Sequence, residues 1–357
     1  MIRLEEGVLC LRLAPQRRAE VRVLVTGGAG YIGSHMILAL EERGYEVIVL
    51  DNLRSGHLDA VLAGKLVIGD VNDGRILQQI FSSRSVSAVL HFAGRIQVQE
   101  SLARPDLYYT DNVEGTLTLL NAMARHRVGV LVLSSSAAVY GAPQESFINE
   151  GHPLHPLSPY GHSKSMAEQM TQDWGRAFDL RYSILRYFNA AGADPLARIG
   201  ERHEPETHLI PNALRAAQQG SVLNLYGSDY ATPDGTCIRD YIHVQDLVDG
   251  HLRALEYLLG GGDSNIVNLG GGKGTSNRMV IRTVEQVTGR KVAVSTRPRR
   301  PGDPAALVAD ISKAQALLDW CPQRSTIETI IADAWRWEQE RMVALPITLL
   351  ESSVNNL

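Results

Sequence analysis

The stretch from Val21 to Ser34 constrains the fold of this chain more than any other. It begins with an apolar run, Val21–Val25, which predicts a buried parallel strand. The glycine-rich loop Gly27–Gly33 follows, and beyond it apolar residues recur at helical spacing. Glycine permits a tight turn and the N-terminus of a helix attracts an anion, so this order of elements is typical of a phosphate-binding turn. We therefore expect an α/β fold with a doubly wound parallel sheet.

A second predicted strand, Val47–Leu50, ends at Asp51. An acid roughly 20 residues after the glycines can accept a ribose 2′-hydroxyl, and it would repel a 2′-phosphate. These features predict a Rossmann-type domain that binds NAD. At the end of the next strand, Asp70 leaves two readings open. It accepts a hydrogen bond from an adenine amino group, or it caps the helix that begins near Asp73.

Strands and helices keep alternating to about residue 190. Further strands are predicted at Lys65–Ile68, Val86–His91, Val128–Leu133 and Leu180–Leu185, and long helices over Pro105–His126 and Tyr160–Phe178. The pattern is less regular afterwards, with one clearly amphipathic helix near Ser276–Gly289. We expect a Rossmann domain over 21–190 and a smaller α/β substrate domain over 191–345, with segments that return to the first domain. Residues 1–20 are predicted to be an N-terminal extension, and 346–357 a tail.

Composition excludes several classes of protein. A net charge of -4 provides no basic field for nucleic acid. No apolar run approaches the roughly 20 residues of a membrane span. The cysteines Cys10, Cys237 and Cys321 have neither metal-binding nor disulfide spacing, so no metal is predicted and a reducing cytoplasm is expected.

Three polar residues predict the chemistry. Tyr160 and Lys164 are four positions apart, which places both side chains on one face of a helix. A nearby ammonium group favours the phenolate, so Lys164 is expected to lower the pKa of Tyr160 and to let it act as a base toward an alcohol. Ser136 lies furthest beyond its strand among Ser134, Ser135 and Ser136, and it is the serine predicted to assist.

Together these motifs resemble the extended short-chain dehydrogenase/reductase superfamily and, within it, the UDP-glucose 4-epimerase family. The resemblance covers about 21–337. Its motifs are Thr26–Gly33, Tyr31–His35, Leu50–Leu53, His91–Gly94, Ser134–Ala137, Val139–Gly141, Ser158–Gly161, Leu185–Asn189, Asp234–Thr236, Arg239–His243 and Arg300–Asp303.

The resemblance implies an isomerase that inverts C4 of a UDP-sugar through a 4-keto intermediate and retains its NAD. A homodimer is expected through the two long helices. The predicted cofactor residues are Gly27, Gly30, Tyr31, Ile32, Gly33, Asp51, Asn52, Asp70, Val71, Phe92, Ala93, Gly94, Asn112, Ser134, Tyr160, Lys164, Tyr187 and Phe188. The predicted substrate residues are Ser136, Tyr160, Asn189, His208, Leu209, Tyr226, Arg239, Arg300, Asp303 and Leu307.

Three residues depart from the family pattern. Ile96 replaces a lysine of many relatives, so one cofactor contact is expected to be missing. His208 stands where several relatives have Asn, and it either borders the uridine pocket or caps the following helix. Leu307 replaces a Tyr of some relatives and leaves more space, which opens UDP-GlcNAc and UDP-GalNAc as alternative substrates. UDP-pentoses and a non-catalytic dinucleotide sensor are further alternatives, and a 4,6-dehydratase is disfavoured by Ala137 and Ala138.

Overall fold

The computed structural model describes the backbone of residues 20–83, 85–143, 145, 147–300 and 303–354, and side chains up to residue 341. The predicted N-terminal extension lies outside this range except for Glu20. In the part of the chain that is described, no helix combines the length and apolar character needed to cross a membrane.

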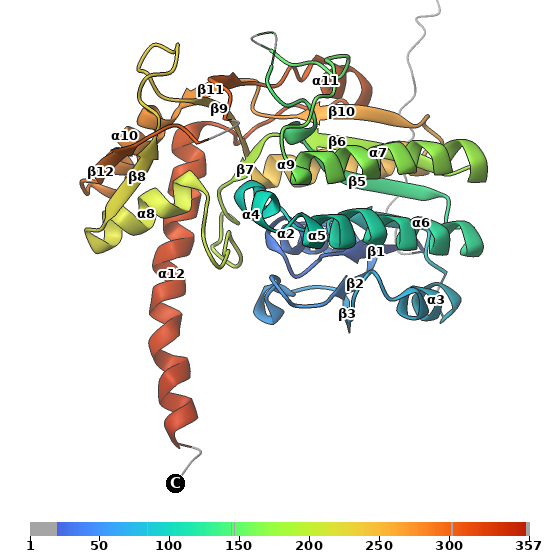
Figure 1. Cartoon of the computed structure of the whole chain (residues 1–357). Coiled ribbons are helices and arrows are strands. Elements are labelled where there is room, and N and C mark those ends of the chain that lie inside the picture. The colour runs from blue at the N-terminus through green and yellow to red at the C-terminus, as the bar shows by residue number, and fades with distance from the viewer. Residues whose placement is uncertain (1–19, 84, 144, 146, 301–302, 355–357) are drawn as a thin grey trace, which may run out of the picture.

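A seven-stranded parallel sheet forms the larger body of the molecule, in the order β10-β6-β5-β4-β1-β2-β3 (Figure 1). The order reverses direction at β1 and β4, as expected for a doubly wound sheet. Its strands are β1 (Arg22–Thr26), β2 (Glu46–Asp51), β3 (Lys65–Ile68), β4 (Ala88–His91), β5 (Val130–Ser136), β6 (Arg181–Tyr187) and β10 (Asn265–Leu269). The predicted strands are confirmed, and all carry their carboxyl ends to one edge.

Helices cover both faces of this sheet because its strands are apolar on both sides. In β1, Val23 and Val25 pack on one face, against α2 (Tyr31–Glu42), α9 (Val244–Leu259) and α11 (Ser312–Leu318). Leu24 packs on the other, against α3 (Gly74–Ser83), α6 (Gly115–His126) and α7 (Pro159–Phe178). The alternation of strand side chains thus divides the core into two layers.

The helix predicted over Pro105–His126 is interrupted. It consists of α5 (Pro105–Tyr108), a π-helical turn (Tyr109–Glu114) and α6, and the short α4 (Val98–Ala103) precedes it. The wider turn carries Asn112, whose carbonyl accepts a hydrogen bond from Thr116 Oγ1 at 2.6 Å. Single π turns inside helices are frequent at functional sites. The apolar periodicity could not show this irregularity, because it preserves the buried face.

A smaller body is built from the C-terminal half. Its strands are short and form two sheets. One sheet contains β7 (Asn189–Ala191), β9 (Ile238–His243), β11 (Gly274–Ser276) and β13 (Ala306–Leu307). The other pairs β8 (Val222–Tyr226) with β12 (Ala293–Arg297). Its helices are α8 (Leu209–Gln219), α10 (Asn277–Thr288) and α12 (Ile327–Val354). Short 3₁₀ turns occur at Leu58–Ala60 and Ala137–Val139.

Two features refine the predicted division at residue 190. The segments α9, β10 and α11 follow residue 190 in the chain but pack with the large sheet. Residues 346–354, predicted as part of a tail, continue α12, which extends away from the rest of the molecule in Figure 1.

Candidate active site

The predicted catalytic residues come from two neighbouring elements. Ser136 ends β5, and Tyr160 and Lys164 lie in the first turns of α7. The helix begins there because Ser158 Oγ accepts a hydrogen bond from the backbone N–H of Gly161 at 3.2 Å, and Pro159 occupies the first helical position. Local sequence therefore fixes which helix face meets the end of the sheet.

The structure brings these side chains together. The Ser136 hydroxyl lies near enough to the Tyr160 hydroxyl to lower the pKa of that phenol, and Lys164 Nζ donates to the carbonyl of Ser134 at 3.1 Å. The Tyr160 ring packs edge-on against Tyr108, with ring centroids 6.2 Å apart. Tyr160 and Lys164 are both buried. A proton-transfer group here is held in one orientation and shielded from bulk water.

Burial also controls the pKa values of these groups. It raises the pKa of Tyr160, and the nearby Ser136 hydroxyl offsets this only in part. Burial lowers the pKa of Lys164 to about 8, against the opposing effect of Glu168. The predicted lowering of the Tyr160 pKa by Lys164 is therefore not seen in the protein by itself, because desolvation of the phenolate is the larger effect.

The neighbouring serines support the site. The Ser135 hydroxyl donates to Glu168, which forms a buried two-pronged ion pair with Arg186. Ser134 Oγ contacts His251 Nε2 at 3.2 Å. Of the three serines, Ser136 is the one whose hydroxyl meets Tyr160.

The glycine loop has the geometry that a dinucleotide requires. Gly27 has φ of 72°, and a Cβ there would lie 2.6 Å from the backbone nitrogen of Ala93. A Cβ on Gly33 would lie 2.1 Å from the carbonyl oxygen of Gly27. The first residue before α2, Gly30, has no side-chain cap, so the N–H groups of Tyr31, Ile32 and Gly33 at the first turn are available to an anion. These observations fit a bound pyrophosphate.

Asp51 joins this loop to the end of β2. Its Oδ2 accepts from the backbone N–H of Ala29 at 2.9 Å, and its Oδ1 from that of Leu53 at 2.8 Å. Each oxygen keeps a second lone pair for a ribose hydroxyl. The structure therefore places Asp51 where the sequence predicted it, at the strand end beside the glycine loop.

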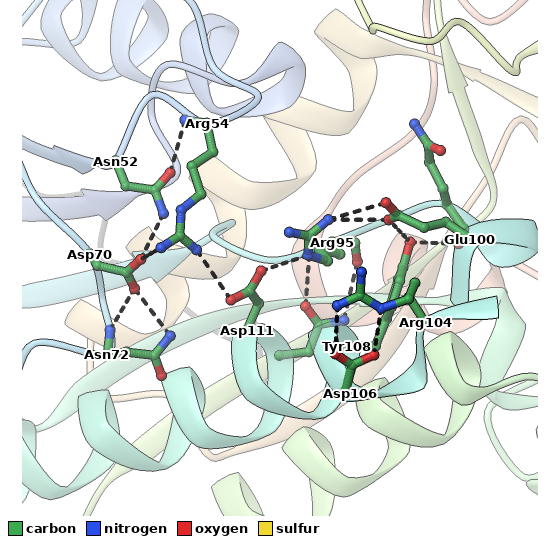
Figure 2. A network of polar contacts seen from close by, with 12 residues as sticks. Asn52, Arg54, Asp70, Asn72, Arg95, Glu100, Arg104, Asp106, Tyr108 and Asp111 are labelled. Carbon is green, nitrogen blue, oxygen red and sulfur yellow. Dashed lines mark hydrogen bonds and ion pairs between the residues drawn. The ribbon is translucent and has the colours of Figure 1, made fainter. Parts of the chain in front are cut away.

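A chain of polar contacts continues along the same edge of the sheet (Figure 2). Asn52 Nδ2 donates to Asp70 Oδ2 at 2.9 Å, and Arg54 lies 3.2 Å from the same carboxylate and 3.6 Å from Asp111. The other oxygen of Asp70 accepts from the backbone N–H of Asn72 at 2.9 Å. Asp70 therefore shapes the turn before α3. The side chain that meets the N-terminus of that helix is Asp73.

The loop after β4 is fastened to the π turn. Asn112 Oδ1 accepts from the backbone N–H of Arg95 at 2.7 Å, and Asn112 Nδ2 donates to Ser163 Oγ at 2.9 Å. Asn112 Oδ1 would lie 2.6 Å from a Cβ on Gly94. The exposed Ile96 follows, and the Arg95 guanidinium before it pairs with Asp111 at 2.7 Å. The buried Asn112 thus positions the backbone expected to border the cofactor.

The remaining predicted cofactor residues differ in the side chains and backbone groups that they contact. The Tyr31 hydroxyl donates to the carbonyl of Gly192 at 2.7 Å, which ties the glycine loop to the smaller body. Val71 and Ala93 pack in or against the apolar layer of α3 and α6, and Phe92 stacks near His251. Phe188 is buried in a small apolar cluster at the junction of the two bodies.

A pocket of about 500 Å³ opens in the smaller body, within the usual size of a ligand site. Four predicted substrate residues, Leu209, Tyr226, Arg300 and Asp303, line it. The Arg300 guanidinium lies over the Tyr226 ring, 4.1 Å from its centroid. The pocket therefore presents a planar cation, an aromatic face and a carboxylate, which suits a nucleotide diphosphate.

The other predicted substrate residues lie on the adjoining strands. Arg239 Nη1 donates to the carbonyl of Pro304 at 2.8 Å, and its Nη2 lies 3.4 Å from Asp303. Leu307 pairs in register with Arg239 across β13 and β9, and Asn189 Nδ2 donates to the carbonyl of Asp240 at 2.9 Å. His208 immediately precedes α8, yet its side chain makes no cap and instead hydrogen-bonds Glu201.

Sequence reasoning missed part of the pocket wall. Asn212, Arg215 and Asn224 also line it. Asn212 follows Leu209 at a spacing of one helical turn, which could have suggested a shared face once Leu209 was chosen. Glu201, His203 and Glu206, which were also missed, surround His208. The Glu and His residues that recur through 201–208 are the sequence pattern that indicates such a cluster.

Comparison with known proteins agrees with this geometry. The model of the NAD dependent epimerase/dehydratase family matches residues 23–270. The chain belongs to this family. It is 49% identical over 319 residues to a UDP-glucose 4-epimerase of Halalkalibacterium halodurans, covering 89% of this chain and 96% of the relative. It is 46% identical over 329 residues to that of Azospirillum brasilense, covering 92% and 94%.

A solved structure of another member has the same fold. The UDP-glucose 4-epimerase from Brucella ovis in complex with NAD is 47% identical and superposes with a TM-score of 0.86, covering 88% of this chain and 98% of that one. The predicted resemblance and the Rossmann-type α/β fold are therefore confirmed.

Proposed function

We propose that this protein is a UDP-glucose 4-epimerase that interconverts UDP-galactose and UDP-glucose. The observation that carries the proposal is the buried Ser136–Tyr160–Lys164 group at the carboxyl end of a dinucleotide-binding sheet. The pocket beside Arg300 supplies the second requirement, a grip on the nucleotide diphosphate. Family membership and relatives of the same activity support both parts.

The site fits NAD as a resident cofactor. Gly27, Gly33 and Gly94 leave the space that close approach of a dinucleotide needs, and Asp51 suits an adenosine ribose without a 2′-phosphate. Asp70, Asn112, Tyr187 and Lys164 would border the rest of the cofactor. When bound, NAD would supply a reversible hydride acceptor for the sugar C4, and its positive ring would favour a phenolate nearby.

Side chains of the protein would transfer the proton of the sugar 4-hydroxyl. Tyr160 would remove the proton of the sugar 4-hydroxyl as C4 is oxidised, and would return it when the 4-keto group is reduced. Ser136 would hydrogen-bond the same oxygen and share its proton with Tyr160. Lys164, held by the carbonyl of Ser134, would contribute positive charge beside the phenolate and contact the nicotinamide ribose.

The diphosphate grip would remain while the sugar turns. Arg239 and Arg300 would bind phosphate oxygens, and Tyr226 with Leu209 would hold the uridine. Asn189, His208, Asp303 and Leu307 would complete the wall of the site. Charged contacts confined to the diphosphate and uridine leave the hexose free to present either face.

Leu307 supports UDP-N-acetylhexosamines as additional substrates. Its side chain is half-buried against the apolar cluster of Tyr140, Phe188 and Ala309, next to Arg239 across the strands, and a larger ring would take up more space there. We expect activity on UDP-GalNAc that Leu307→Tyr reduces about tenfold relative to UDP-galactose, since steric selection in a pocket is typically of this size. Equal failure of the parent and the variant on UDP-GalNAc would contradict this extension.

We further infer a cytoplasmic homodimer. Exposed apolar side chains lie on or just before the helices expected at the interface. Tyr109, Met166 and Phe178 fall within the two predicted ranges, and Val98 and Leu102 lie on the preceding α4. Apolar surface of this kind on neighbouring helices favours a helical bundle between two copies. Sedimentation equilibrium at micromolar concentration tests it. A monomer mass would contradict the dimer.

The proposed function is tested by incubating purified protein with UDP-galactose, with and without added NAD. Conversion to UDP-glucose without accumulation of NADH is expected, and conversion in the absence of added NAD would show that the cofactor is retained. Failure of conversion in the presence of NAD would contradict the assignment, and UDP-pentoses would be assayed next. A chain that binds NAD but converts neither hexoses nor pentoses would instead be a dinucleotide sensor.

A further inference from the structure

A compact cluster of two glutamates and two histidines lies outside the group assigned to proton transfer. Glu201, His203, Glu206 and His208 each offer one ligand atom, and these four atoms all lie within 4.8 Å of one another. All four come from the segment that enters α8. The sequence predicted no metal because its cysteines lack the spacing, but this cluster uses carboxylate and imidazole groups.

Three atoms of this Glu/His cluster have separations close to those of a tetrahedral centre. His203 Nδ1 lies 3.3 Å from Glu201 Oε1 and 3.7 Å from Glu206 Oε2. His208 Nδ1 lies 3.8 Å from the other oxygen of Glu206. A tetrahedral zinc ion with bonds of about 2.1 Å separates its ligand atoms by about 3.4 Å. His208 Nδ1 also hydrogen-bonds Glu201, and this partly exposed imidazole can withdraw to admit an ion.

Glu206 gives independent evidence for a missing ligand. Its side chain is only 1% exposed. Its Oε1 accepts from the backbone N–H groups of Thr207 and His208, at 2.8 and 2.9 Å, but its Oε2 is buried without a hydrogen-bond partner. The Arg215 guanidinium is 4.0 Å away. His203 Nδ1 is also buried without a hydrogen bond. Buried polar atoms of this kind are costly unless something pairs with them.

We propose that Glu201, His203, Glu206 and His208 bind one zinc ion. Imidazole nitrogen and carboxylate oxygen are both good zinc ligands, and a divalent cation balances the two buried carboxylates. Four protein ligands leave no open position, so the site is structural and takes no part in the hydride chemistry.

The position of the site explains what such an ion stabilises. The His203 ring packs edge-on against Tyr31 of the glycine loop, with centroids 6.2 Å apart. His208 immediately precedes α8, whose Leu209 lines the substrate pocket. Arg202, between two ligands, pairs with Asp59 of the large body. Zinc would brace the cofactor loop against the substrate pocket.

A metal-free ion-pair network is the competing arrangement. Burial lowers the pKa of His203, but Glu201 and Glu206 raise it by more, to about 10, so a protonated imidazole could balance the carboxylates instead. The two arrangements differ in what they bind. The network has no use for zinc, whereas the proposed site retains it.

The test measures metal content and does not depend on the proposed enzymatic function. Tag-free protein is treated with EDTA, desalted, incubated with a slight excess of ZnCl₂ and desalted again, and zinc per chain is measured by mass spectrometry. The variants are His203→Gln and Glu206→Gln, with His155→Gln as the control because His155 is exposed and far along the chain from the cluster. Circular dichroism verifies that each variant is folded.

We expect about one zinc per wild-type and His155→Gln chain, and at least tenfold less in each cluster variant. The zinc absorption edge should report nitrogen and oxygen ligands at 2.0–2.2 Å and no sulfur. Loss of zinc in one folded cluster variant suffices if the other does not fold. Absence of zinc from the wild type, or equal retention by all four proteins, would overturn the proposal and leave the ion-pair network.

Discussion

The predicted site residues of the two bodies differ in their charged partners. In the Rossmann body, Tyr160 and Lys164 are buried, and within the described residues neither forms an ion pair, although the neighbouring Glu168 and Arg186 pair with each other. In the smaller body, site residues pair with one another. Arg239 lies 3.4 Å from Asp303, and His203 and His208 lie within ion-pair distance of Glu201.

This difference separates two tasks. Proton transfer needs a fixed geometry and a site without competing water, which burial provides. A nucleotide diphosphate needs positive charge that stays ionised, which partly exposed arginines provide. We expect changes in the Rossmann body to act on turnover, and changes in the smaller body to act on binding.

Tyr160→Phe should give the largest effect. It removes the hydroxyl and keeps the ring that packs on Tyr108, so the fold should be preserved. General acid–base groups contribute about 10²- to 10⁴-fold, and we expect kcat to fall about 10³-fold with a small change in KM. Tyr108→Phe is the matched control, since the Tyr108 hydroxyl donates to Glu100 and lies outside the Ser136–Tyr160–Lys164 group. A similar kcat for both variants would contradict the assignment of Tyr160 as the group that transfers the proton.

The pH dependence of stability should distinguish the two bodies. Burial lowers the pKa of His251 to about 4, so the stability that depends on its neutral form is present above its ordinary value of 6.5 and is lost as the pH falls through about 4. The pKa of His203 is raised to about 10, so its contribution is present below 6.5 and is lost as the pH rises through about 10.

Melting temperatures between pH 4 and pH 10, measured in EDTA, check both signs. His251→Gln should reduce the loss of unfolding free energy on the acid side of the pH–stability curve, by roughly 3 kcal/mol near pH 4. His203→Gln should reduce the loss on the alkaline side. If both variants changed stability on the same side of the pH curve, the proposed difference between the two bodies would be wrong.

Gly33→Ala tests the cofactor turn. The added Cβ would meet the backbone of Gly27 at 2.1 Å, and no rotamer change can relieve this. A displacement of about 1 Å in a positioned site costs about 100-fold in rate, and we expect activity at limiting NAD to fall by this factor. Gly74→Ala is the control, because its Cβ would meet only Thr118 at 3.7 Å. Full activity of Gly33→Ala would show that this turn tolerates movement.

Arg300→Ala should give a smaller effect that lies mainly in binding. Loss of a charged hydrogen bond costs about 1.5–3 kcal/mol, so KM for the UDP-sugar should rise at least tenfold while kcat changes little. Arg282→Ala is the control, since Arg282 is an exposed arginine of α10 and is not one of the residues that line the pocket. A fall in kcat equal to the rise in KM would place Arg300 in the catalytic step instead.

Local sequence was enough to predict the Rossmann body. Alternating apolar runs determined its strands, and the Gly27–Gly33 loop and Asp51 fall where the spacing placed them. The helix predicted near Ser276–Gly289 is confirmed as α10, with Ser276 capping its start and Gly289 following its end. These features depend on neighbours in sequence, which periodicity and capping rules describe well.

Other features depend on contacts between distant segments. The π turn at Asn112, the helical continuation of α12 beyond Pro346 and the pocket wall at Arg215 leave no periodic signal. The raised pKa of Tyr160 follows from burial, which the Tyr-x-x-x-Lys spacing alone cannot give. Sequence thus predicted a group of side chains that lie together at the strand end, but not its electrostatic environment.

The fate of the hydrogen at C4 tests the central claim most directly. UDP-galactose deuterated at C4 is incubated with the enzyme in ordinary water, and the UDP-glucose formed is analysed by mass spectrometry and NMR. Removal and return of one hydride within a closed site predicts that the product keeps its deuterium at C4 and that no reduced cofactor is released. Loss of the deuterium to solvent, or its appearance in free NADH, would contradict the account.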